Sequence, residues 1–209
     1  EISECLVGSE MCIRDRYGPK RTGMDRVRVF VIDPPWNRKK GGLRKVRKRQ
    51  GRALDYPTMS VPAIFSLLDR EIFPLAEDGH CVFLWTIDAC LPESEREMRE
   101  RGYRLHCRMI WDKGNGVAPA FTVRYSHEYL VWYYKPKLPA IAREWRGKFT
   151  TVFAERGRQH SRKPDFCYEM IGLLYPDCVK MDVFSREYRA GWLQYGNQTD
   201  YFNEPQKRT

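Results

Sequence analysis

The sequence predicts an α/β protein with a doubly wound sheet, and two observations predict it. Short apolar runs rich in β-branched and aromatic residues alternate along the chain with segments of helical periodicity, which is typical of strands joined by helical crossovers. The chain has 209 residues, enough for one domain of this kind with a sizeable core and too few for two. We therefore expect a single domain over residues 24–203.

Six apolar runs are the predicted strands. The first, Val27–Ile32, is followed by two prolines, which cannot continue a hydrogen-bonded ladder. The second, Cys81–Thr86, is almost continuously apolar, as expected of a strand that is covered on both faces. The remaining strands are predicted at 105–111, 128–134, 179–184 and 192–195.

Three helices are predicted between these strands. The first covers 60–72, because Ser60 is a good N-cap and the apolar residues after it have helical spacing. The second, 92–102, is highly charged and is closed by a glycine. The third starts at a proline and covers 164–174, whereas the basic stretch 136–162 is expected to be irregular.

The predicted catalytic residues are Asp33, Pro34, Pro35 and Trp36, which directly follow the first strand. Open α/β sheets place their ligands at such a strand end. An adenine amino nitrogen is a poor nucleophile, and hydrogen bonds from its N–H groups to the Asp33 carboxylate and the Pro34 carbonyl would restore its electron density. The prolines are expected to point that carbonyl outward, and Trp36 to offer a face for an extruded base.

This arrangement predicts methylation of a base amine, with a sulfonium cofactor as the methyl donor and no metal. The alternative interpretation is a plain proline turn after a core strand. In that case Asp33 would be a local cap and Trp36 a core residue.

The net charge of +10 is concentrated in the loop 38–52, where nine of fifteen residues are basic and none is acidic. Such a loop has too few apolar residues to bury a core face, so its expected partner is the phosphate backbone of nucleic acid. A solvated loop or a nuclear-import patch is the alternative. The basic residues are Arg38, Lys39, Lys40, Arg44, Lys45, Arg47, Lys48, Arg49 and Arg52.

Composition excludes several other classes of protein. The seven cysteines are odd in number and scattered, which favours free thiols in a reducing compartment and a cytoplasmic location. The four histidines show no ligand spacing, so structural zinc is not expected. No stretch is long and apolar enough to cross a bilayer, so we expect a soluble protein.

Residues 1–16 fit no element leading into the first strand. They resemble translated sequencing-adapter sequence, so we expect a non-native segment and set it aside. Met24 could then be the true start.

Several further motifs occur in a fixed order, and together they carry a resemblance. The chain resembles the family of the seventy-kilodalton subunit of mRNA N6-adenosine methyltransferase, with its bacterial and phage members, over about residues 27–200. Besides the tetrapeptide at 33–36, the motifs are Tyr56-Pro57-Thr58-Met59-Ser60, Phe83-Leu84-Trp85-Thr86, His160-Ser161-Arg162-Lys163-Pro164-Asp165, Phe184-Ser185-Arg186, Gly191-Trp192 and Gly196-Asn197-Gln198.

The resemblance implies a circularly permuted class I methyltransferase with a Rossmann-like sheet. In such a protein the catalytic motif precedes the segment that binds S-adenosylmethionine. This order explains why the chain has no Gly-x-Gly-x-x-Gly element.

The resemblance also implies the residues that hold the cofactor. Lys163 resembles the group near the methionine carboxylate, helped by the positive N-terminus of the helix that follows. Asn197 and Gln198 resemble amide contacts to the ribose and adenine of the cofactor, and Tyr56 resembles an aromatic residue beside the target base. The other cofactor-binding residues that it implies are Asp33, Asp182 and Arg186.

We therefore expect an S-adenosylmethionine-dependent N6-adenine methyltransferase that acts on nucleic acid, with DNA favoured over RNA. DNA is favoured because the chain is small and resembles bacterial and phage members. The expected setting is the cytoplasm of a bacterium or a phage-infected host, as a monomer or homodimer. The alternatives are a cytosine-N4 DNA methyltransferase and a non-catalytic nucleic-acid-binding subunit of a methyltransferase complex.

Overall fold

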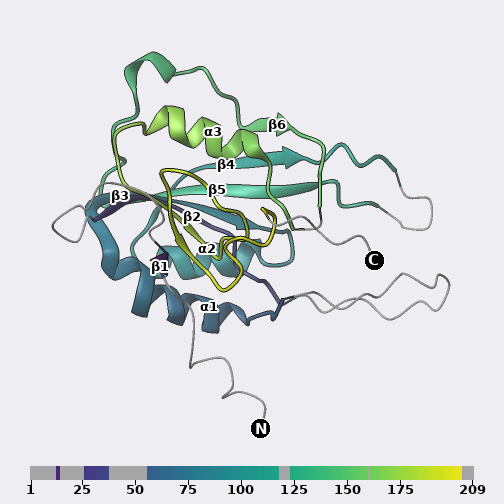
Figure 1. Ribbon diagram of the computed structural model, residues 1–209, viewed down its shortest axis with the longest axis horizontal. Coiled ribbons are helices and arrows are strands. Elements are labelled where there is room, and N and C mark those ends of the chain that lie inside the picture. Colours follow the sequence, from purple (N-terminus) through teal and green to yellow (C-terminus); the bar gives the residue numbers. More distant parts are fainter. Residues whose placement is uncertain (1–12, 15–25, 38–55, 118–122, 160, 204–209) are drawn as a thin grey trace, which may run out of the picture.

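The computed structural model of the chain describes residues 13–14, 26–37, 56–117, 123–159 and 161–203. In this part of the chain eight strands form one sheet, in the order β1-β8-β7-β2-β3-β5-β4-β6 (Figure 1). The strands are β1 (Ile13–Arg14), β2 (Val27–Ile32), β3 (Ala76–Thr86), β4 (Arg104–Asp112), β5 (His127–Lys135), β6 (Val152–Ala154), β7 (Lys180–Val183) and β8 (Leu193–Tyr195).

The centre of the sheet is parallel. Strand β2 pairs in parallel with β3 on one side and β7 on the other, and β8 extends the parallel part beyond β7. Strand β5 is antiparallel to both β3 and β4. The register places Ile32 of β2 beside Leu84 of β3 and Val183 of β7. These three strands therefore end at one edge of the sheet, where open α/β sheets bind their ligands.

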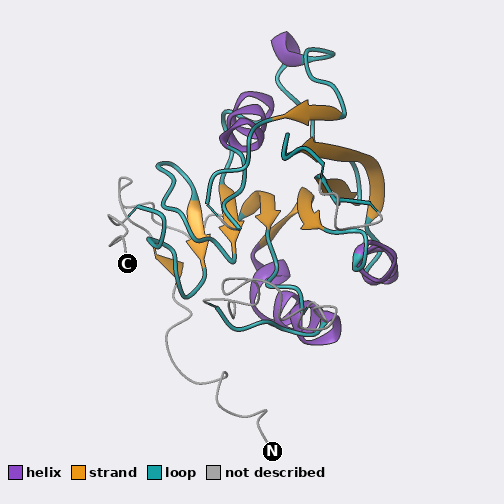
Figure 2. Cartoon of the chain, turned by 90° about the vertical axis from the view of Figure 1, so that its right-hand side faces the viewer, coloured by secondary structure: helices purple, strands orange, loops and turns teal. Residues whose placement is uncertain are grey.

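Helices cover both faces of the sheet, so its central strands are buried on both sides (Figure 2). Along β2, Phe30 and Ile32 pack with the first two helices, whereas Val29 and Val31 pack with the third. The helices are α1 (Val61–Leu67), continued by a π-helical turn (Leu68–Ile72) and a 3-10 turn (Phe73–Leu75), α2 (Leu91–Glu100) and α3 (Asp165–Leu174). Among the described residues no helix has the length and hydropathy needed to span a bilayer.

The predicted Rossmann-like α/β architecture is confirmed, and each predicted strand and helix is present. Ser60 caps α1 as expected, because its side chain accepts a hydrogen bond from the Ala63 amide. The stretch 136–162 is less irregular than predicted: it contains β6, which pairs in parallel with β4, and a 3-10 turn at Arg143–Trp145. A three-residue strand is too short for its periodicity to show in a sequence.

Two further predictions concern the N-terminal segment 1–16 and the basic loop 38–52. Within the segment 1–16, Ile13–Arg14 forms β1 and pairs antiparallel with β8, although the sequence indicated no element there. The basic loop 38–52 lies outside the described residues.

The N-terminus of α3 is capped by a carboxylate from another part of the chain. Pro164 precedes the helix, and its own side chain offers no cap. The Glu155 carboxylate instead accepts hydrogen bonds from the amides of Asp165 and Phe166, at 3.1 and 3.0 Å. An anion at this position also complements the helix dipole.

We predict that Glu155→Ala lowers the free energy of unfolding by about 1 kcal/mol, because two helix-terminal amides lose their acceptor. Urea denaturation followed by circular dichroism measures this change. Glu144→Ala, an exposed position in the 3-10 turn, is the matched control and should change stability by a few tenths of a kcal/mol at most. Equal stability of the two variants would contradict the role of Glu155 as a cap.

Candidate active site

A pocket lies at the carboxyl edge of the sheet, beside the end of β2. Its empty space is about 270 Å³, with the open mouth included. Four of the predicted site residues line it: Asp33, Lys163, Asp182 and Arg186. The other lining residues are Ser161, Arg162, Tyr168, Phe184, Ser185, Glu187, Arg189 and Phe202. The fold thus brings together residues that are up to 169 positions apart in the chain, from Asp33 to Phe202.

The tetrapeptide ends β2 as predicted, but the placement of Trp36 corrects its predicted role. Trp36 is 8% exposed and packs in the core, and its indole N–H donates to the Trp85 carbonyl at 3.0 Å. The indole therefore anchors the tetrapeptide to β3 and does not present an open face to a base. Burial of a large aromatic ring beside a strand end outweighs any gain from exposing it.

The Pro34 carbonyl makes a hydrogen bond within the tetrapeptide, and its predicted contact with the amine stays a prediction. It accepts a hydrogen bond from the Trp36 amide at 2.8 Å, so one of its lone pairs is used within the tetrapeptide and only the second can serve a ligand. The Pro35 carbonyl accepts from the Met59 amide at 2.8 Å. These bonds fix the backbone on both sides of the turn and hold Asp33 at the pocket.

A buried lysine joins Asp33 to a second carboxylate. Lys163 Nζ lies 2.9 Å from Asp33 Oδ1 and 3.2 Å from Glu128 Oε2. The other oxygen of Glu128 binds Lys113 Nζ at 2.5 Å. The Lys163 side chain is 10% exposed, so all of its ammonium charge must be balanced locally. Two carboxylates and two ammonium groups thus alternate in this series of ion pairs, and their charges cancel.

The pKa values of Asp33 and Glu128, the two carboxylates in this series of ion pairs, are shifted in opposite directions. Burial raises the pKa of Asp33 above its ordinary value, and attraction to Lys163 only partly offsets that rise. Burial also raises the pKa of Glu128, but Lys163 and Lys113 together outweigh it, so the net pKa is lowered. For Lys163 burial lowers the pKa, and attraction to Asp33 and Glu128 more than reverses this. Lys163 therefore stays charged at physiological pH.

These contacts bear on the role predicted for Lys163. Its ammonium group is bonded to Asp33 and Glu128, so two of its three hydrogens are used. The first amides of α3 are capped by Glu155 and are not open to a ligand. A contact between Lys163 and the methionine carboxylate stays a prediction.

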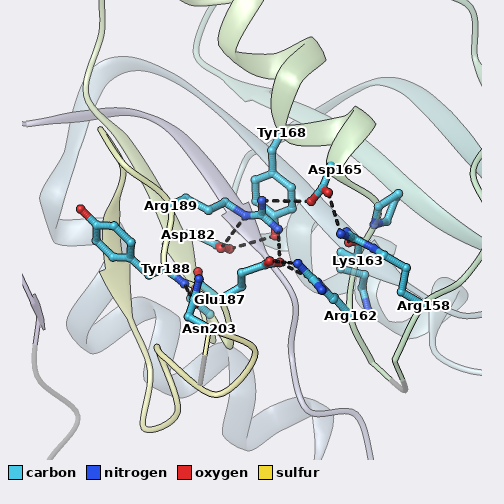
Figure 3. Close-up of polar contacts among 12 residues, drawn as sticks. Arg158, Arg162, Lys163, Asp165, Tyr168, Asp182, Glu187, Tyr188, Arg189 and Asn203 are labelled. Carbon is cyan, nitrogen blue, oxygen red and sulfur yellow. Dashed lines mark hydrogen bonds and ion pairs between the residues drawn. The ribbon is translucent and has the colours of Figure 1, made fainter. Parts of the chain in front are cut away.

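The opposite wall of the pocket is built around Asp182 on β7. Asp182 is 2% exposed and accepts a hydrogen bond from the Tyr168 hydroxyl at 3.3 Å. Burial raises the pKa of Asp182 to about 7, although Arg189, the Ser185 hydroxyl and Tyr168 oppose the rise. Figure 3 shows Asp182, Tyr168 and Arg189 together with the ion pairs around them.

Arg186 and Tyr56 lie together at the side of the pocket. The Arg186 guanidinium is 4.8 Å from the centre of the Tyr56 ring and 4.0 Å from that of Tyr201, and the Tyr56 hydroxyl is 3.0 Å from Ser161 Oγ. The two predicted amides are not among the lining residues: Asn197 is exposed and Gln198 is half-buried. Five predicted residues therefore lie at or beside the pocket, whereas Asn197 and Gln198 do not line it. The five are Asp33, Tyr56, Lys163, Asp182 and Arg186.

The backbone is strained where it lines the pocket. Ser161 and Phe184 have φ of 67° and 62°, values that cost free energy for residues other than glycine and that cluster at functional sites. Gly196 packs against this turn, since a Cβ built there would meet the Ser185 carbonyl oxygen at 3.0 Å. The glycine therefore lets the segment after β8 approach the segment after β7.

The predicted site residues did not include Tyr168, Glu187 or Arg189. Glu128 is the second residue of β5, and a carboxylate near the start of an apolar strand is a signal that the sequence does offer. Tyr168 fits the apolar face of α3, and Arg189 lies in a charged segment with no periodicity. Among the described residues no group of three or more His, Cys, Asp and Glu side chains has a metal-binding arrangement.

Comparison with known proteins identifies the family of the chain. The model of the MT-A70 family matches residues 27–198, a range that includes the tetrapeptide, Lys163 and Asp182. The chain belongs to the MT-A70 family. The resemblance drawn from the motifs is therefore confirmed at the level of the family.

Individual relatives are more distant. N(6)-adenosine-methyltransferase MT-A70-like of Arabidopsis thaliana is 27% identical over 179 residues, which cover 81% of this chain and 23% of that protein. Type II methyltransferase M.MunI of a Mycoplasma species is 23% identical over 187 residues, 82% of this chain and 77% of that protein. N6-methyladenosine RNA methyltransferase MTA1 of Pyricularia oryzae is 24% identical over 197 residues, which cover 84% of this chain and 48% of that protein. The chain spans about a quarter of the length of its plant MT-A70 relatives.

We predict that Lys163→Met lowers the free energy of unfolding by about 3 kcal/mol at neutral pH, because two buried carboxylates lose their shared cation. The loss should shrink toward pH 4. Lys163 lowers the pKa of both Asp33 and Glu128 against the effect of burial, so without it both carboxylates take up protons at a higher pH, and protonation in acid removes the cost of the missing cation.

Urea denaturation at neutral and acidic pH measures this prediction. Lys148→Met is the control, because Lys148 is exposed and has no ion pair with a described residue. A loss of stability that is the same at both pH values would mean that the shared cation is not what Lys163 contributes.

Proposed function

We propose that this MT-A70 family protein transfers a methyl group from S-adenosylmethionine to the N6 amine of adenine in nucleic acid, with DNA as the preferred polymer. The observation that carries the proposal is the placement of Asp33. Its carboxylate is held by Lys163 at 2.9 Å at the end of the central strand and lines the pocket. The family match over residues 27–198 supports the reaction class.

Asp33 has two tasks in the proposed reaction. Its carboxylate accepts a hydrogen bond from the amine, which orients the nitrogen and raises its electron density. The amine must also lose a proton when its new bond to carbon forms. Burial raises the pKa of Asp33, so this carboxylate is a better proton acceptor than an exposed aspartate.

The residues of the pocket fit S-adenosylmethionine. When bound, this cofactor supplies an electrophilic methyl group. Its ribose hydroxyls need acceptors, and the buried Asp182 carboxylate offers two oxygens for them. Its sulfonium charge suits a pocket that is lined by the carboxylates of Asp33 and Asp182. Asn197 and Gln198 directly follow Gly196, whose close packing brings that segment toward the pocket.

The preference for DNA rests on the similarity to a protein named a type II methyltransferase. The chain covers 77% of a protein named a type II methyltransferase, but only 23% of the Arabidopsis adenosine methyltransferase. We further propose that Tyr56 contacts the target base, since its ring lies against Arg186 at the side of the pocket. The basic loop 38–52 is proposed to contact phosphates.

The direct experiment incubates the protein with labelled S-adenosylmethionine and matched DNA and RNA, followed by digestion and identification of the methylated nucleoside. N6-methyladenine in DNA is the expected product. N4-methylcytosine, or label in RNA alone, would overturn the corresponding part of the proposal. No product with either polymer would favour a non-catalytic binding subunit.

We predict that Asp33→Asn lowers the rate of methyl transfer by about two to three orders of magnitude, because the amide removes a charged acceptor at the reacting nitrogen. Binding of nucleic acid should change little. Single-turnover kinetics measure the rate, and fluorescence anisotropy measures the affinity. A variant as fast as the parent would show that Asp33 does not act on the amine.

We also predict that replacing the basic residues of the loop 38–52 by serine flattens the salt dependence of nucleic-acid binding by a log–log slope of roughly four, if about five phosphates are contacted. Affinity should fall for every sequence alike, since phosphate contacts do not read bases. The proposal for the loop fails if the variant keeps the salt slope of the parent.

A further inference from the structure

Arg189 lies inside the pocket and contacts three carboxylates. Its Nη2 is 2.8 Å from Glu187 Oε2 and its Nη1 is 3.4 Å from Asp165 Oδ1. Its Nε is 3.9 Å from Asp182 Oδ2. The guanidinium also stacks on Tyr168, with its central carbon 3.5 Å from the centre of the ring (Figure 3). The arginine is therefore fixed on several sides.

The three carboxylates do not depend on Arg189 equally. Glu187 is also paired with Arg162, and Asp165 is also paired with Arg158 at 2.6 Å. Among the described residues, Arg189 is the one cation within ion-pair distance of Asp182. Asp182 is also the most deeply buried of the three, since its side chain is 3% exposed. Of the three carboxylates, Asp182 would thus be the one that loses its only ion-pair partner among the described residues when Arg189 is removed.

We propose that Arg189 is a positioning residue for the cofactor: its charge beside the buried Asp182 keeps that carboxylate ionised, so that both of its oxygens can accept the hydroxyl groups of a ribose. This inference rests on the proposed function and extends it to a residue outside the predicted set. An ionised carboxylate accepts hydrogen bonds through both oxygens, whereas a protonated one uses an oxygen as a donor.

The surroundings of Asp182 make its charge sensitive to this contact. The groups that face it are Arg189, the Ser185 hydroxyl, Tyr168 from α3 and Asp33 from the end of β2. Burial and the negative charge of Asp33 favour the protonated form, while Arg189 and the two hydroxyls favour the ionised form. The pKa of about 7 is the balance of these effects, so losing the arginine must move it upward.

The sign of the pH dependence follows from this balance. Cofactor binding should be strong where Asp182 is ionised and should weaken as pH falls through its pKa. Without Arg189 the same weakening should begin at a higher pH. At neutral pH the variant would therefore bind less tightly than the parent, and at alkaline pH the two should converge.

The test is the dissociation constant of S-adenosylmethionine, measured by titration calorimetry between about pH 6 and pH 9. For Arg189→Gln we expect the midpoint of the pH dependence of binding to rise by about one pH unit. Affinity for S-adenosylmethionine near neutral pH should fall roughly tenfold. Arg189→Lys restores the charge without the stacking geometry and should give an intermediate midpoint. Asp182→Asn should remove this pH dependence.

Arg158→Gln is the matched control. Arg158 belongs to the same ion network through Asp165, but it does not line the pocket or contact Asp182. Its midpoint should equal that of the parent. Circular dichroism of each variant without cofactor confirms the fold, and Arg189→Lys carries the test if Arg189→Gln does not fold.

Two results would overturn the inference. An unchanged midpoint in Arg189→Gln would show that the arginine does not control the charge of Asp182. Tighter binding at every pH would show that Arg189 blocks the site. A parent protein that fails to bind S-adenosylmethionine at any pH would instead refute the proposed function itself, so the two failures are distinguishable.

Discussion

The arrangement of the site depends on one buried ammonium group, that of Lys163 between Asp33 and Glu128. Three segments meet there: the end of β2, the start of β5 and the approach to α3. A single cation satisfies two carboxylates that would otherwise repel each other in a region of low dielectric. Lys113 balances the remaining charge through Glu128. The backbone bonds of the tetrapeptide place Asp33 at the strand end, and the ammonium group of Lys163 then holds its carboxylate in one position.

The second wall of the pocket depends on backbone geometry as much as on charge. The turn after β7 takes a positive φ at Phe184 and is held by hydrogen bonds from Phe184 and Ser185 to the Tyr195 carbonyl. Gly196 allows this close approach. Asp182 lies just before this turn and Arg189 a few residues after it. The strained backbone at Phe184 therefore fixes where these two polar groups lie.

Much of the fold could be predicted from the sequence, because strands such as β2 and β3 are buried on both faces and are written as continuous apolar runs. The strand end at Asp33 was predicted for the same reason, since two prolines stop the ladder. The interior position of Trp36 was not predicted, because one residue has no periodicity. Arg189 and Glu155 were also missed, since their partners lie in other segments and only the tertiary structure brings them together.

In the proposed reaction Asp33, held by Lys163, must be ionised to accept a hydrogen bond and then a proton from the amine. The most direct measurement is the pH dependence of single-turnover methyl transfer in the parent and in Lys163→Met. Loss of the cation should raise the pKa of Asp33 further, so the fall in rate on the acid side should begin at a higher pH in the variant. An acid limb at the same pH in both proteins would contradict the account.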